Sequence, residues 1–207
     1  YEVSLVVVEQ QATYVPGPPV GSARTLVGGS LGTRLVSAGP TRIGADQVTS
    51  VRITGAAADT TYVLATEPDD PPGAPATGWP MTVVAQDADM VTLRLPQHDL
   101  APGVRRLDAV STVEGLPAGR DSIGLTVVPT VLALVGTAQA GAAATVTTAH
   151  CGPDTEIFVD GRSVPPTAVT PTTVTFTVPA GTAPGPHAVT LRSHRVAGPV
   201  FTLDVAP

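Results

Sequence analysis

Hydrophobic residues recur along this chain in short runs, and turn-forming residues separate one run from the next. This spacing is typical of a β-sandwich or barrel, because βαβ units need longer helical segments between their strands. The strands expected in the first part are residues 34–37, 47–54, 61–66, 81–86, 90–95, 105–113 and 122–128. Those expected in the second part are residues 130–135, 143–149, 156–159, 173–178, 187–193 and 200–205.

Two local patterns support the strands of the second part. Thr173-Val174-Thr175-Phe176-Thr177-Val178 alternates polar and apolar residues, as a half-buried strand does. Asp160-Gly161 separates Ile157-Phe158-Val159 from Arg162-Ser163-Val164. An Asp-Gly pair between two strand-forming runs predicts a hairpin with a two-residue turn.

A series of sequence elements occurs twice, with a spacing of about 80 residues. Val91-Thr92-Leu93-Arg94-Leu95-Pro96 precedes Leu100-Ala101-Pro102-Gly103, and Val174-Thr175-Phe176-Thr177-Val178-Pro179 precedes Thr182-Ala183-Pro184-Gly185. Each copy continues into a valine-containing strand and then into a closing strand that ends in proline. Units of this size without a helical pattern fit an immunoglobulin-like sandwich. The sequence therefore predicts an all-β protein with two tandem immunoglobulin-like β-sandwiches that arose by duplication.

The N-terminal part is expected to lie outside both sandwiches. We expect residues 1–14 to supply the terminal strand of a preceding domain. Residues 15–22 are rich in proline and glycine and predict a stiff, extended linker. The first immunoglobulin-like domain is expected at residues 23–129 and the second at residues 130–207.

The composition supports a globular β-protein. Hydrophobic residues make up 43% of the chain and charged residues 14%, which indicates a well-buried core and argues against disorder. Aromatic residues make up only 3%, so the core must consist mainly of valine, leucine and alanine. With 21 glycines and 22 prolines, the chain has little room for long helices.

Charge and length argue against two classes of partner. The net charge is −6 and no patch gathers the basic residues, all of which are arginine, so nucleic-acid binding is disfavoured. No apolar run reaches the roughly 18 residues of a membrane span. Residues 1–9 are too short for a signal peptide and lack a basic flank and a cleavage site. We therefore expect neither nucleic acid nor direct membrane insertion.

Cys151 is the single cysteine, so an intrachain disulfide is impossible. This slightly favours the cytoplasm over an extracellular location. A lone cysteine of this kind is more often a small buried hydrophobic residue than a nucleophile.

The histidines are the first candidates for metal ligands or bases: His98, His150, His187 and His194. A zinc site needs three or four convergent ligands. His150 and Cys151 are adjacent and would point to opposite faces of a strand, and His187 and His194 are expected near opposite ends of a hairpin. Structural or surface histidines are the favoured interpretation.

Other candidate sites also have an ordinary structural interpretation. Glu67-Pro68-Asp69-Asp70 and Asp87-Ala88-Asp89 offer oxygens to calcium, but neither matches a calcium loop, so solvated turn residues are favoured. Val27-Gly28-Gly29-Ser30-Leu31-Gly32 is glycine-rich, yet no lysine and no helix follow it. Trp79 lies in a Pro/Gly-rich insertion and is either core or an exposed contact for sugar or protein. We expect the chain to have no enzymatic activity and to bind neither a metal ion nor a cofactor. The sequence assigns no binding residue.

The second unit resembles the TIG or IPT immunoglobulin-like domains that are shared by plexins and transcription factors. The resemblance lies in Glu156-Ile157-Phe158-Val159-Asp160-Gly161, the alternating strand at 173–178 and Pro184-Gly185 before His187-Ala188-Val189-Thr190-Leu191. It covers most of residues 130–207, and it implies a fold but no particular function. The first unit is a looser match, with an insertion around residues 67–80.

The first nine residues, Tyr1-Glu2-Val3-Ser4-Leu5-Val6-Val7-Val8-Glu9, resemble the final strand of the N-terminal domain of cap proteins from phage-tail-like contractile injection systems. Some members of that family carry immunoglobulin-like domains after this strand. The resemblance implies a structural protein that closes the end of the sheath and inner tube as a hexameric ring. Its partners would be sheath and tube subunits, and the particle would assemble in the cytoplasm.

A second class of function is an extracellular module, either adhesin-like or a carbohydrate-binding accessory part of a secreted bacterial protein. It explains the tandem fold equally well. A signal sequence upstream would favour it, whereas a small terminator domain upstream would favour the cap protein.

Overall fold

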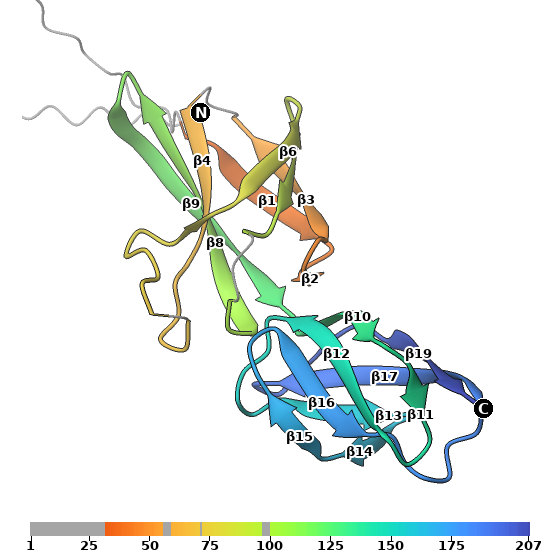
Figure 1. The fold of residues 1–207 in the computed structure, drawn as a ribbon. Helices are drawn as coiled ribbons and strands as arrows, with labels where there is room; N and C mark the ends of the chain where they lie inside the picture. The colour runs from red at the N-terminus through yellow and green to blue at the C-terminus, as the bar shows by residue number, and fades with distance from the viewer. Residues whose placement is uncertain (1–31, 56–58, 71, 97–99) are drawn as a thin grey trace, which may run out of the picture.

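The computed structural model describes residues 32–207, except residues 56–58, 71 and 97–99. The expected strand at 1–14, the linker at 15–22, most of the glycine-rich run at 27–32 and His98 lie outside the described residues. The described chain forms two β-sandwiches, which Figure 1 shows end to end. No described residue is in an α-helix, so nothing in this part qualifies as a membrane-spanning helix.

The first sandwich consists of two sheets. Its strands are β1 (Arg34–Gly39), β2 (Arg42–Ile43), β3 (Val48–Thr54), β4 (Asp59–Leu64), β5 (Trp79–Pro80), β6 (Thr82–Gln86), β7 (Met90–Arg94), β8 (Gly103–Val113) and β9 (Leu116–Val127). One sheet has the order β1-β3-β7-β6 and the other the order β2-β9-β8-β4-β5. The strands are antiparallel except for β2, which pairs with the end of β9 in parallel.

The second sandwich begins directly after Val128-Pro129. Its strands are β10 (Thr130–Val135), β11 (Ala138–Gln139), β12 (Ala143–Ala149), β13 (Glu156–Val159), β14 (Arg162–Val164), β15 (Pro166–Val169), β16 (Thr173–Thr177), β17 (Gly185–Ser193), β18 (Val196–Ala197) and β19 (Phe201–Ala206). The sheet orders are β10-β12-β16-β15 and β11-β19-β17-β13-β14, with β18 paired to β17.

The two sandwiches share one topology, from β1 with β10 to β9 with β19, and only β18 has no counterpart among the described strands of the first sandwich. Even the irregularities recur. The first strand of each unit shifts register against its partner, at Leu35/Ser37 and at Val131/Ala133. The edge strand of the same sheet also shifts, at Val83/Ala85 and at Pro166/Ala168. This correspondence confirms that one domain type occurs twice, and the chain is all-β with two tandem immunoglobulin-like sandwiches.

Each sandwich has its own core, built from alternate residues of its strands. In β3, Val51 and Ile53 are fully buried while their neighbour Arg52 is exposed, as period-two alternation requires. In β16, Val174 and Phe176 occupy the same inward positions. The cores consist mainly of valine and leucine, with isoleucine and alanine in equal number and few aromatic residues.

The Asp-Gly hairpin prediction is confirmed. Asp160 and Gly161 connect β13 to β14 and have φ angles of 49° and 76°. A two-residue turn with positive φ at both positions matches the right-handed twist of the flanking strands. Asp160 is thereby fixed at the surface, beside the start of β17.

Sequence patterning missed the shortest strands. β2, β5, β11 and β18 have two residues each, and β15 begins at a proline. So few positions are too short for an alternating pattern to be recognised. These strands form because their backbones pair with strands elsewhere in the chain. His150 and Cys151 were expected on a strand, but they follow the end of β12, and His150 has a φ of 59°.

Candidate functional site at the joint between the sandwiches

The two sandwiches meet where β9 passes into β10, and the fit there is close. A Cβ atom added to Gly198 would lie 1.9 Å from the carbonyl oxygen of Pro129, and one added to Gly44 would lie 2.1 Å from Oγ1 of Thr130. Arg42 of β2 donates a hydrogen bond from Nη2 to the carbonyl oxygen of Ala197 over 2.5 Å. The β18 turn of the second sandwich therefore packs directly on the connection and on the first sandwich.

A buried ion pair forms the first sandwich's side of the joint. Arg105 of β8 pairs with Asp70, and both side chains are 0% exposed. Asp70 also accepts hydrogen bonds from the backbone N–H of Glu67 and of Ala101 and from Nε1 of Trp79, each at 3.0 Å. Arg105 donates further hydrogen bonds to two backbone carbonyl groups. The ion pair thus fixes residues 65–78, the insertion between β4 and β5, against the start of β8.

The charge on Asp70 is stabilised by these contacts. Burial raises the pKa of Asp70, but hydrogen bonds from Arg105, Glu67, Trp79 and Ala101 outweigh it and lower the pKa to about 2. Asp70 is therefore ionised over the whole physiological range. The sequence predicts solvated turn residues at 67–70, and this prediction is wrong for Asp70, whose side chain is fully buried.

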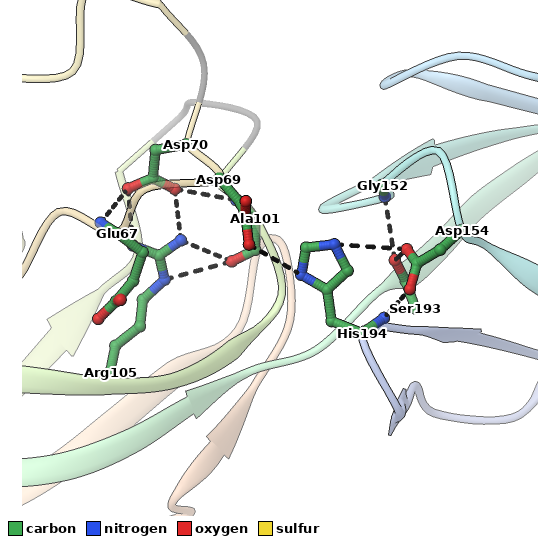
Figure 2. A network of polar contacts seen from close by, with 9 residues as sticks. All are labelled: Glu67, Asp69, Asp70, Ala101, Arg105, Gly152, Asp154, Ser193 and His194. Atoms are coloured by element: carbon green, nitrogen blue, oxygen red, sulfur yellow. Dashed lines mark hydrogen bonds and ion pairs between the residues drawn. The ribbon is translucent and has the colours of Figure 1, made fainter.

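His194 of the second sandwich lies between carboxylates of both sandwiches. Its Nδ1 is 4.0 Å from Oδ2 of Asp69, and its Nε2 is 3.4 Å from Oδ1 of Asp154. Figure 2 shows the imidazole ring between the insertion, which carries Asp69, and the loop that carries Asp154. The imidazole ring therefore faces one carboxylate of each sandwich.

Asp154 is held in place by the second sandwich alone. It accepts hydrogen bonds from Oγ of Ser193 at 2.8 Å and from the backbone N–H of His194 at 2.7 Å. Burial raises its pKa, yet these hydrogen bonds and the positive potential of His194 bring the pKa below its ordinary value. Ser193 in turn accepts a hydrogen bond from the backbone N–H of Gly152.

Ser193, His194 and Asp154 are the residue types of a hydrolytic triad, but their connections differ. In a triad the serine is hydrogen-bonded to the histidine, which removes its proton. Here the hydroxyl group of Ser193 donates to Asp154, the same carboxylate that His194 contacts. Ser193 is also buried, with 1% exposure. This arrangement positions the loop and provides no activated nucleophile.

His150 is the most enclosed histidine of the described residues. It is 2% exposed, and neither ring nitrogen completes a hydrogen bond with a described residue. Burial lowers its pKa to about 4, and the backbone of Leu100 in the first sandwich only partly offsets this effect. His150 is therefore neutral at pH 7, although it belongs to a charged neighbourhood.

A cleft of about 420 Å³ lies at the joint beside these groups. Its lining is mainly apolar, and Asp69, Cys151 and His194 are its ionisable side chains. The residues that line it are Asp69, Pro72, Ala101, Cys151, Gly152, Pro153, Pro171 and His194. Cys151 is half-buried here, and its Sγ lies 3.8 Å from the carbonyl oxygen of Ala149.

The structure brings together only some of the candidate residues. His150, His194 and the acidic stretch meet at the joint, whereas His187 pairs with Asp160 at a distant hairpin. Asp87 and Asp89 lie at the β6–β7 hairpin, as expected. Trp79 is core, with 7% exposure. Among the described residues, no three His, Cys, Asp or Glu side chains converge on a metal position.

Sequence reasoning missed Arg105 and Asp154. Arg105 was assigned only to a strand, and nothing nearby in the sequence indicates that it pairs with Asp70, which lies 35 positions away. A usable signal was present in the repeat itself. Arg105 and His187 follow the two Pro-Gly turns at equivalent positions, so a cation-bearing residue recurs there.

Comparison with known proteins identifies no family. No family model and no curated protein match the chain. Among solved structures, the chain is similar to the plexin A4 extracellular region, with 12% identity, coverage of 89% of this chain and 20% of that chain, and a TM-score of 0.33. It is also similar to SGBP-B from a Bacteroides ovatus mixed-linkage glucan utilization locus, in complex with a heptasaccharide (14% identity, 80% and 44% coverage, TM-score 0.31).

A third similar structure contains the N-terminal eight Ig domains of Down Syndrome Cell Adhesion Molecule. Identity is 14%, coverage is 84% of this chain and 24% of that chain, and the TM-score is 0.30. This chain therefore spans less than half the length of each of these three proteins. Likeness at such TM-scores carries no argument about function, and the immunoglobulin-like assignment follows from the strand order described above.

Proposed function

We propose that the described part of the chain is a non-catalytic structural module that holds two immunoglobulin-like domains in one relative orientation. The observation that carries the proposal is the joint, where Gly44, Gly198 and the connecting residues pack without space for a Cβ atom. An ion-pair network covers a second side of the same joint. A flexible tether between binding domains needs neither feature, because inter-domain motion is the default for a small polar interface.

A pair of glycine variants tests this proposal. Gly198→Ala places a methyl group on the carbonyl oxygen of Pro129, so we expect the sandwiches to reorient while each remains folded. Gly181→Ala is the matched control, because its added Cβ meets no atom within 4 Å. Small-angle X-ray scattering and residual dipolar couplings measure the orientation. The proposal is contradicted if the residual dipolar couplings of the unsubstituted protein already show that the two sandwiches sample many relative orientations.

At a finer level, we propose that this module is the peripheral part of a cap protein of a contractile, phage-tail-like particle. The support is the resemblance of residues 1–9 to the terminal strand of that family, followed by tandem immunoglobulin-like domains. Affinity purification of the full-length protein from its native host, with mass spectrometry and electron microscopy, tests it. Co-purified sheath and tube subunits, with label at one particle end, are expected. Recovery only from the medium or cell wall overturns it.

The alternative is an adhesin-like or carbohydrate-binding accessory module. Carbohydrate-binding proteins often stack the apolar C–H face of a sugar ring on an exposed aromatic side chain. In the described residues, Tyr62, Trp79 and Phe176 are buried, Phe201 packs partly against the core, and Arg192 covers the ring of Phe158 at 5.2 Å. The described surface therefore favours protein contact over sugar stacking. A glycan array with the full-length protein decides between them, and specific binding of a neutral glycan favours the alternative.

A further inference from the structure

His150 belongs to the second sandwich, but its ring lies close to groups of the first. It directly follows β12, whereas Leu100, Arg105 and Asp70 of the first sandwich determine its electrostatic environment. Leu100 is itself only 1% exposed. The residues next in sequence to Leu100 and His150, Ala101 and Cys151, both line the cleft at the joint, so the buried ring lies where the two sandwiches meet.

The joint compensates a protonated His150 only in part, through the backbone of Leu100. The two charged groups that face the ring, Arg105 and Asp70, already neutralise each other in a fully enclosed ion pair. The other titratable groups of the joint, Asp69, Asp154 and His194, are engaged with one another along the cleft. Neither ring nitrogen completes a hydrogen bond with a described residue. A positive charge on His150 is thus buried with too little compensation to offset its loss of hydration, which is costly.

We propose that protonation of His150 opens the joint at acidic pH: the two sandwiches separate while each stays folded. The cores do not depend on this residue, because His150 lies in neither cluster of buried apolar side chains. The inference rests on the fixed joint proposed above.

The direction and pH range follow from linkage. The pKa of His150 is about 4 in the closed joint, below its ordinary value of 6.5, which applies once the ring is hydrated. The open form therefore binds the proton more readily, and the closed joint keeps its full stability only above pH 6.5. As the pH falls to about 4, the ratio of open to closed molecules rises by roughly 160-fold, towards a limit of roughly 300-fold at still lower pH.

The neighbouring ion pair stays intact across this range. The pKa of Asp70 is about 2, so Asp70 remains ionised and bound to Arg105 while His150 becomes protonated. Separation of the sandwiches and acid unfolding of the first sandwich therefore occur in different pH ranges. This difference makes the proposal testable.

The experiment follows the maximum dimension of the protein by small-angle X-ray scattering between pH 7.5 and 3.5. We expect an increase on acidification, with unchanged far-ultraviolet circular dichroism and unchanged fluorescence of Trp79, which reports on the core of the first sandwich. His150→Asn removes the titrating ring and tolerates the positive φ of this position. This variant should keep the same dimension at pH 7.5 and 3.5.

His187→Asn is the matched control, because it removes a histidine far from the joint and should retain the increase. A direct NMR titration of the His150 ring in the unsubstituted protein gives a second measurement that does not depend on any variant. A constant dimension down to pH 3.5, an increase that persists in His150→Asn, or an increase that coincides with loss of β-structure overturns the proposal. A joint that is already flexible at pH 7.5 instead contradicts the fixed orientation on which it rests.

Discussion

Arg105 in the first sandwich and His187 in the second occupy equivalent positions with different environments. Each lies two positions after the glycine of an Ala-Pro-Gly turn, at the start of β8 or β17. Each donates a hydrogen bond to the carbonyl oxygen of that turn's alanine, Ala101 or Ala183. Each also contacts an aspartate that follows the preceding paired strand, Asp70 after β4 or Asp160 after β13.

The two pairs differ in the segment that carries the aspartate. Asp160 lies in a two-residue turn and leaves its pair at the surface, with 50% of the Asp160 side chain exposed. Asp70 lies in the insertion between β4 and β5, which covers the pair completely. The same type of contact is therefore a buried structural element in one copy and a surface contact in the other. The buried copy is the one that faces the joint.

Breaking the buried pair should have the largest effect. Asp70→Asn leaves the Arg105 charge enclosed without a counter-charge, so we expect the first sandwich to lose about 3–5 kcal/mol of unfolding free energy. Urea denaturation followed by Trp79 fluorescence measures this loss. Replacing both members by apolar residues, in Asp70→Leu with Arg105→Met, should recover much of the stability. A single-variant loss below about 1 kcal/mol would show that the pair is not enclosed in solution.

The insertion's attachment to β4 should come next in magnitude. Gly78 has a φ of 91°, and an added Cβ atom would lie 2.6 Å from Cγ1 of Val63 and 2.7 Å from the carbonyl oxygen of Leu64. Backbone strain and overpacking combine, so Gly78→Ala should cost about 2–4 kcal/mol in thermal or urea unfolding. Gly136→Ala has a similar φ of 79° and no neighbour within 4 Å. Gly136→Ala therefore measures the cost of backbone strain alone. Equal losses of unfolding free energy in the two variants would contradict a close packing of the insertion.

The exposed pair should give the smallest effect on stability and a clear effect on titration. Both ring nitrogens of His187 face acceptors, Asp160 and the carbonyl oxygen of Ala183, which favours the doubly protonated ring. These hydrogen bonds raise the pKa of His187 above 6.5. The associated stabilisation is complete below pH 6.5 and is lost as the pH rises through the folded value.

Asp160→Asn removes the charge but keeps a residue type that accepts the φ of 49°. We expect the pKa of His187, followed by NMR, to fall towards 6.5. Asp87→Asn, at a hairpin of the other sandwich, should leave this pKa unchanged. An unchanged His187 titration in Asp160→Asn would show that the contact does not form in solution.

Much of the fold was predictable from the sequence because it depends on local alternation. The bounds of β10, β12 and β13 agree with the strands expected at 130–135, 143–149 and 156–159. The Asp160-Gly161 turn follows from the positive φ angles that only a few residue types accept. Repetition of the Pro-Gly turn likewise predicted a second copy with the same topology.

The candidate site was not predictable in this way. Asp69 and Asp70 are adjacent in sequence, yet Asp70 is enclosed with Arg105 while the Asp69 side chain is 72% exposed and faces His194. The sequence by itself determined the strands, the tight turn and the duplication, because these depend on residues close to one another along the chain. Only the tertiary structure decided which charges are buried and which histidine is shielded from water. Burial depends on which surfaces the two sandwiches and the insertion cover, and those surfaces come from residues far apart in the sequence.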